Sequence, residues 1–195
     1  MSKAALLCCS WRGVRVWLAC AALCALSAQA EATIMRYLEV EELARLSTDV
    51  IHGEIISTKV FWDETHTRIY TSVRVRIHET FKGTAQRGAT VTVTQQGGEL
   101  DGLRQDYSGR PVFTAGETVV LFTKPGRNHD LTVVGLKQGK LRVNGDEVLR
   151  DFNGITLLDE LPQSKTAGRA NAASKPMRVQ TRLTLGELRA RLAKL

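Results

Sequence analysis

The clearest pattern of hydrophobic and polar positions lies in the middle of the chain, in the segment Ile69–Phe81. Apolar residues and Thr alternate there with polar and basic residues, and this period of two predicts a strand with one buried and one solvated face. The preceding segment Asp49–Trp62 is rich in β-branched residues, which favour strands. A short polar stretch, 63–67, separates the two segments, so the sequence predicts an antiparallel hairpin.

This hairpin has an expected register, in which Trp62 lies opposite Arg68. Opposed residues of an antiparallel pair are close enough for their side chains to interact. The opposed pairs in this register are Glu54 with Arg76, Thr58 with Ser72, and His52 with His78.

Shorter β segments are expected after the hairpin. Ala89–Gln95 alternates again, whereas Glu117–Lys124 is almost continuously apolar, which predicts a central strand covered on both faces. The segment Gly97–Gly116 between them is rich in glycine and is expected to be a long loop. Turn signals at 138–139 and 144–145 divide three further short strands, expected at Leu131–Leu136, Lys140–Val143 and Glu147–Arg150.

One amphipathic helix is expected at each end of this strand-rich region. The first is Arg36–Thr48, whose spacing of three to four residues places on one side Tyr37, Val40, Leu43, Ala44 and Ser47. The second is Leu185–Lys194, where Thr184 and Glu187 match a capping box. Its leucine stripe predicts docking on the core, and a free helix that binds a partner is the alternative.

The order of these elements predicts a mainly β fold. We expect a small OB-like antiparallel barrel of five or six strands with an N-terminal and a C-terminal helix, because closure removes the edges of long strands. A two-sheet sandwich is the alternative. The expected organisation is a signal peptide at 1–30, a β-barrel domain at 31–160, a flexible basic linker at 161–183, and an amphipathic helix at 184–195.

The first thirty residues match a secretory signal peptide. A basic start precedes the apolar run Val16–Leu26, and Ala28-x-Ala30 fits signal peptidase, so cleavage is expected before Glu31. The apolar run is too short to cross a bilayer as a helix. We therefore expect an exported protein, periplasmic or extracellular, without a transmembrane segment after cleavage; an uncleaved anchor or a lipoprotein on Cys20 or Cys24 are the alternatives.

Signal cleavage changes both the cysteine content and the charge. All four cysteines precede Glu31, so the mature chain forms neither a disulfide nor a thiolate metal site. Removing Lys3, Arg12 and Arg15 lowers the formal net charge of +7 by three, to +4. This modest charge does not favour nucleic acid as a partner.

The chain resembles a family of uncharacterised bacterial exported proteins. The blocks that carry this resemblance, in order, are Asp49–Ile55, Ile69–Val75, Phe81–Gly83, Gly97–Glu99, Phe113–Phe122 and Thr184–Leu188. The pattern is also distantly similar to the netrin-like modules of tissue metalloprotease inhibitors, which implies an OB-type barrel. Those inhibitors act through an N-terminal cysteine and disulfides, which the mature chain lacks, so inhibition does not carry over residue by residue.

Candidate ligand-binding residues lie on the hairpin and in the long loop. Trp62 and Tyr70 are aromatic residues near the outer face of the hairpin. Arg104 and Tyr107 belong to the Gly97–Gly116 loop, and long loops on rigid scaffolds frequently carry function. These four residues are the expected binding residues.

Candidate metal ligands are His52, His78 and Glu54. Two imidazoles and a carboxylate on one face of the hairpin can bind zinc. The set depends on the register, since a slip of one residue moves the side chains to the other face. Exposed histidines without a ligand are the alternative.

The sequence contains no catalytic motif such as Gly-x-Ser-x-Gly or His-Glu-x-x-His. We expect a non-catalytic binding or interaction module without a cofactor. Its expected partner is an envelope or extracellular protein or glycan, and not nucleic acid. The alternatives are a metal-binding protein or hydrolase that uses His52, His78 and Glu54, and a secreted inhibitor by fold analogy alone.

Overall fold

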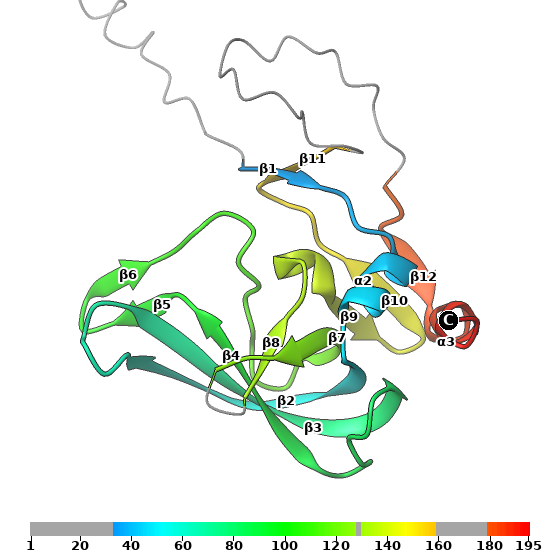
Figure 1. Cartoon of the computed structure of the whole chain (residues 1–195), viewed down its shortest axis with the longest axis horizontal. Helices are drawn as coiled ribbons and strands as arrows, with labels where there is room; N and C mark the ends of the chain where they lie inside the picture. Colours follow the sequence, from blue (N-terminus) through cyan, green and yellow to red (C-terminus); the bar gives the residue numbers. More distant parts are fainter. Residues whose placement is uncertain (1–32, 128–129, 159–178) are drawn as a thin grey trace, which may run out of the picture. The chain divides into compact units, whose positions relative to one another are not determined.

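A computed structural model describes residues 33–127, 130–158 and 179–195 (Figure 1). The fold in these ranges is mainly β with two helices, α2 (Val40–Leu46) and α3 (Leu185–Leu192), as the sequence predicts. The predicted signal peptide lies outside the described residues, as does the predicted linker up to residue 178. No helix in the described ranges has the length and apolarity to cross a membrane.

Most strands belong to one large sheet. Its strands are β2 (Asp49–Trp62), β3 (Ile69–Lys82), β4 (Thr90–Gln96), β7 (Thr118–Pro125), β8 (Leu131–Val133), β9 (Lys140–Asn144), β10 (Glu147–Arg150) and β12 (Arg182–Thr184). Their order across the sheet is β12-β10-β9-β7-β2-β3-β4-β8, and β8 pairs with β7 as well as with β4. The end of the predicted linker is therefore a strand, because Arg182–Thr184 pairs with β10.

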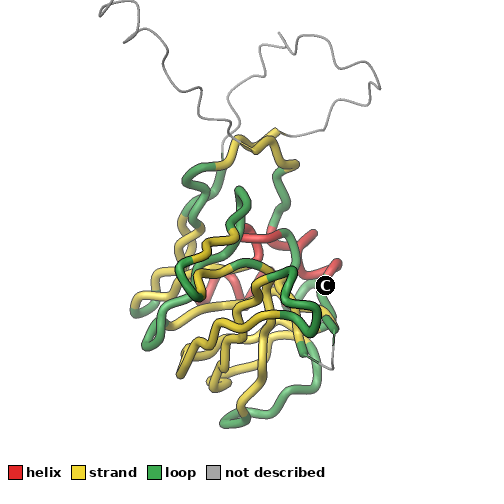
Figure 2. The backbone as a smooth tube through the Cα atoms, turned by 90° about the vertical axis from the view of Figure 1, so that its left-hand side faces the viewer, coloured by secondary structure: helices red, strands yellow, loops and turns green. Residues whose placement is uncertain are grey.

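Two small sheets complete the described strands, and the sequence pattern predicts neither of them. β1 (Thr33–Arg36) pairs in parallel with β11 (Ile155–Leu158), and the two strands lie side by side in Figure 1. β5 (Gly98–Leu100) and β6 (Leu103–Gln105) form a hairpin inside the segment predicted to be a loop. Figure 2 shows how strands and turns alternate along the backbone.

Helix α2 is shorter than predicted. Arg36 ends β1, and the backbone N–H of Tyr37 donates to Leu158 while that of Leu38 donates to the Gln138 side chain, so these residues are held outside the helix. The predicted buried side of the segment is confirmed, since Tyr37, Val40, Leu43, Ala44 and Ser47 are all buried.

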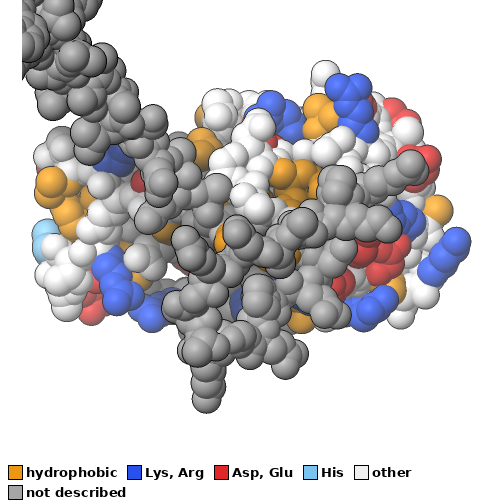
Figure 3. Space-filling view, turned by 90° about the horizontal axis from the view of Figure 1, so that it is seen from above, with side chains coloured by type: hydrophobic (Ala, Val, Ile, Leu, Met, Phe, Trp, Pro, Cys, Tyr) orange, Lys and Arg blue, Asp and Glu red, His pale blue; other side chains and the backbone are white. Residues whose placement is uncertain are grey.

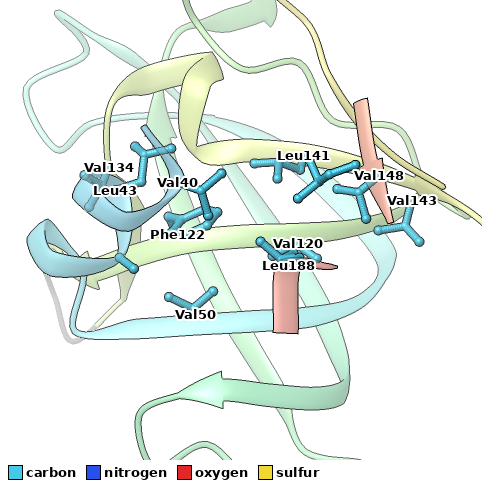
Figure 4. Packing of buried hydrophobic residues seen from close by; sticks show 12 residues of the cluster. Val40, Leu43, Val50, Val120, Phe122, Val134, Leu141, Val143, Val148 and Leu188 are labelled. Atoms are coloured by element: carbon cyan, nitrogen blue, oxygen red, sulfur yellow. The ribbon is translucent and has the colours of Figure 1, made fainter. Parts of the chain in front are cut away.

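The hydrophobic core lies on both sides of β7, as its continuous apolar sequence predicts. Val120 and Phe122 pack with residues of α2, α3, β9 and β10, and Figure 4 shows this cluster. Val119 and Leu121 point to the other side and pack with residues of β2, β3 and β4. Leu188 of α3 is fully buried in the first cluster, so the C-terminal helix docks on the core.

The β2–β3 hairpin is confirmed, but its register changes along its length. Glu54 opposes Arg76 as predicted, whereas Thr58 opposes Val73 and Trp62 opposes Ile69, so those predicted pairs are wrong. The cause is a set of register shifts: Phe81 and His78 are extra residues in β3, the latter at the shift between His52 and Gly53, and Ile56 is an extra residue in β2. A Cβ atom at Gly53 would lie 2.3 Å from the Arg76 carbonyl oxygen, so glycine permits this close approach.

Candidate functional site

The two histidines of the hairpin do come together. His52 opposes Glu79 in the register and not His78, yet the centroids of the His52 and His78 rings lie 5.5 Å apart, edge to face. The His52 ring also stacks on Phe81 at 6.3 Å. The bulge beside His52 therefore brings the predicted pair into contact without direct pairing.

The environment of His52 disfavours its protonation. Its Nε2 atom is buried and has no hydrogen-bond partner among the described residues. Burial lowers the pKa of His52 below its usual value, and the charges of His78 and Arg189 lower it further, against an opposing contribution from Glu79. His52 is therefore a neutral imidazole at neutral pH.

The predicted three-ligand metal set is not formed. In the part of the chain that the structure describes, no three His, Cys, Asp or Glu side chains are arranged to hold a metal ion. Glu54 opposes Arg76. The carboxylate of Glu79, the residue that opposes His52, forms an ion pair with Arg189 of α3 at 2.8 Å. Only the histidine pair of the predicted set remains.

The four predicted binding residues do not share a surface. Trp62 opposes Ile69, while Tyr70 opposes Phe61 and stacks on it with ring centroids 6.0 Å apart. Because neighbouring positions of a strand point to opposite faces, Trp62 and Tyr70 lie on different sides of the hairpin. The Trp62 indole instead donates a hydrogen bond of 3.0 Å to Asp101 in the β5–β6 turn.

The segment predicted to be a binding loop is held in place by its own polar groups. Arg104 and Arg110 both pair with Asp106, at 3.0 and 2.9 Å, and these hydrogen bonds, that from Arg110 first, lower the pKa of Asp106 to about 2. Tyr107 is half-buried, and its burial raises its pKa. The side chain of Gln105 accepts from the backbone N–H of Ile69 at 2.7 Å, which ties β6 to β3.

A pocket of about 440 Å³ lies where the end of this segment meets the second half of the large sheet. We call it the basic pocket. Residues from six parts of the chain line it, namely Arg110, Pro111, Val112, Glu117, Lys137, Lys140, Arg142, Leu149, Arg150, Asp151, Asn153, Thr181 and Arg182. Six of these residues are Lys or Arg and two are Asp or Glu, so cations exceed anions in its wall.

Glu117 organises one side of the basic pocket. Its carboxylate accepts from Lys140 at 2.7 Å and from Arg142 at 2.9 Å. Burial alone would raise the pKa of Glu117, but these two hydrogen bonds prevail and lower it. Burial lowers the pKa of Lys140, against the effect of Glu117. Two cations thus share one carboxylate, which leaves one positive charge uncompensated.

Arg150 adds a second uncompensated charge. Its side chain is only 5% exposed and lies between the rings of Tyr37 and Phe152, 5.0 Å from each centroid. It donates to the Tyr37 hydroxyl and to the Leu38 carbonyl oxygen, both at 2.7 Å, while its Nε is buried and has no partner in the part of the chain that the structure describes. Burial lowers the pKa of Arg150, but a guanidinium remains charged in a protein.

The basic pocket is not predicted from the sequence. Its cations come from the end of the 97–116 segment, the 3₁₀ turn Leu136–Gly139, and strands β9, β10 and β12. The one local signal is the alternation of Lys140 and Arg142, which places both cations on one face of β9. On the face in Figure 3, Lys and Arg side chains are interspersed with Asp and Glu.

Comparison with known proteins does not assign the chain to a family. No protein-family model matches it, and no curated protein matches it significantly.

Proposed function

We propose that this chain is an exported, non-catalytic binding module that contacts an envelope or extracellular component through the basic pocket. The single observation that carries the proposal is the excess of cations in the pocket wall, two of which lack a carboxylate of their own among the described residues. Cations that are not neutralised within a protein attract an anionic partner and fix its orientation. The signal-peptide pattern of residues 1–30 supports export.

The proposal includes an OB-like barrel as the scaffold. Its support is the strand pairing, because β8 pairs with both β4 and β7, and β7, β2, β3 and β4 are consecutive neighbours in the sheet. Strands β9, β10 and β12 lie outside this set of five paired strands, extend the sheet beyond β7, and carry residues of the pocket wall. A rigid scaffold of this kind holds binding groups in place without catalysis.

The test is equilibrium binding of the purified exported protein to envelope material isolated from the cells that produce it. We expect the wild-type protein to sediment with this material and the double variant Arg142→Gln/Arg182→Gln to remain largely in the supernatant. Arg74→Gln removes the same charge from an exposed position of β3 outside the pocket and is the matched control. Equal sedimentation of the wild type and the double variant would contradict the proposal, as would a wild type that does not sediment.

A further inference from the structure

We infer that the basic pocket binds a carbohydrate that carries carboxylate groups, such as an oligosaccharide of uronic acids. This inference rests on the proposed function and narrows it to one chemical class of ligand. It follows from the combination of groups in the pocket wall and from their placement on the sheet.

Two exposed arginines stand on either side of an apolar residue. Leu149 of β10 opposes Arg142 of β9 on one side and Arg182 of β12 on the other, so the three residues form a row across the sheet. Arg142 pairs with Glu117 at 2.9 Å and Arg182 pairs with Glu147 at 3.3 Å, but their side chains are 63% and 74% exposed, so both guanidinium groups remain accessible to a ligand. Because adjacent strands are about 4.8 Å apart, the two arginine backbones lie roughly 10 Å from each other.

This row fits an acidic sugar chain. An arginine guanidinium forms two parallel hydrogen bonds with a carboxylate, and each end of the row offers one guanidinium. Leu149 between them presents an apolar surface on which the C–H face of a sugar ring can lie. The row therefore accommodates acidic groups that are separated by the body of a sugar residue.

The rest of the pocket wall offers partners for hydroxyl groups. Asp151 and Asn153 come from the β10–β11 connection and are exposed, and Thr181 precedes β12. Carboxylate and amide oxygens accept hydrogen bonds, while amide N–H and hydroxyl groups donate them, so this set can pair with sugar hydroxyls of either orientation. The Asp151 carboxylate also accepts from the backbone N–H of Asn153 at 2.9 Å and pairs with Lys137 at 3.5 Å, which holds it in the pocket wall.

Other anionic ligands fit the wall less well. None of the thirteen lining residues that the structure describes is aromatic, and stacking on aromatic side chains is the usual basis of single-stranded nucleic-acid binding. The apolar part consists of Pro111, Val112 and Leu149 alone, which is too small to cover a lipid acyl chain. The carbohydrate class uses all the group types in the wall.

The experiment is isothermal titration of the exported protein with oligogalacturonate, with a neutral galactose oligomer of equal length, and with inorganic phosphate. We expect binding of oligogalacturonate and no binding of the other two. Arg142→Gln and Arg182→Gln should each weaken this binding about tenfold, because each removes a charged hydrogen-bonding group. Arg74→Gln should leave the dissociation constant unchanged, which controls for the loss of one positive charge.

The remaining outcomes overturn the inference in distinguishable ways. If the neutral oligomer or phosphate binds as tightly as oligogalacturonate, the ligand class is wrong, although envelope binding that depends on Arg142 and Arg182 would still support the proposed function. If Arg74→Gln weakens binding as much as the pocket variants, the interaction is unspecific charge attraction. If oligogalacturonate does not bind while envelope material does, the class is again wrong and the proposed function stands.

Discussion

Arg189 of α3 and Glu79 of β3 form a two-point ion pair, with the Arg189 Nε and Nη2 atoms 3.0 and 2.8 Å from the two carboxylate oxygens. The same guanidinium lies over the ring of Phe81, 5.8 Å from its centroid. This contact joins the C-terminal helix to the end of the long hairpin beside His52. It orients a helix that is anchored by its buried leucine.

Loss of this ion pair should loosen α3 locally. We expect Arg189→Gln to increase amide hydrogen exchange in Leu185–Leu192 while the core strands exchange as before, because the pair connects only the helix to β3. Arg74→Gln, an exposed arginine elsewhere on β3, is the control. Unchanged exchange in the helix of the Arg189 variant would show that the ion pair does not hold it.

Leu188 should be the main apolar anchor of the same helix. Its side chain is fully buried, so Leu188→Ala is expected to lower the free energy of unfolding by about 2–4 kcal/mol. Leu195→Ala, at an exposed position of the same stripe, should have little effect. Urea denaturation followed by circular dichroism measures both. Equal stability of Leu188→Ala and the wild type would mean that α3 is a free helix.

The hairpin should require glycine at position 53. A Cβ atom there would meet the Arg76 carbonyl oxygen at 2.3 Å, so Gly53→Ala is expected to destabilise the protein by about 1–3 kcal/mol through the displaced backbone. Apart from its chain neighbours and the backbone of α3, the nearest atom to a Cβ at Gly186 is the Thr184 Oγ1 at 3.8 Å, so Gly186→Ala should be neutral or slightly stabilising. Thermal unfolding of the two variants distinguishes these effects, and a Gly53→Ala protein as stable as Gly186→Ala would refute the bulge geometry.

Stability should fall between neutral and mildly acidic pH because of His52. Its pKa in the folded protein is lowered from the ordinary value of 6.5, so the unfolded chain takes up the proton first. The corresponding stability is present above pH 6.5 and is lost as the pH falls below 6.5 and through the folded pKa. The charged groups around the imidazole are His78 and Glu79 of β3, Arg87 after β3, and Arg189 of α3.

Replacing the imidazole isolates this effect. We expect His52→Gln to flatten the decrease in unfolding free energy between pH 7 and pH 5, a pH range above that in which carboxylates titrate. The control is His66→Gln, in the turn between β2 and β3, which should retain the decrease. The measurement is urea denaturation at several pH values. An identical pH profile for His52→Gln and the wild type would exclude His52 as the source.

The strands were predictable because their patterns are local. The alternation in Ile69–Phe81 and the continuous apolar run of β7 identify buried faces without knowledge of partners. The parallel pairing of β1 with β11 joins segments far apart in the sequence, and neither strand has a local pattern that indicates the other. Tertiary pairing also converts Arg36 from the expected first residue of a helix to the last residue of a strand.

The candidate site was predictable only in part, for the same reason. His52 and His78 lie on one hairpin, so a local register argument finds their contact even though the bulge changes the pairing. The row of Arg142, Leu149 and Arg182 depends on three strands, the last of which begins within the predicted linker. No pattern within one segment brings these residues together, so the sequence alone points to the hairpin and the loop instead.

The most direct test of the basic pocket as the binding surface is to map amide chemical shifts during titration with the acidic oligosaccharide fraction of the envelope. The account predicts changes confined to residues 110, 112, 137–142, 149–153 and 181–182, and their loss in Arg142→Gln/Arg182→Gln. Changes confined to residues 62–76 or 97–107, or no changes at saturating ligand, would contradict it.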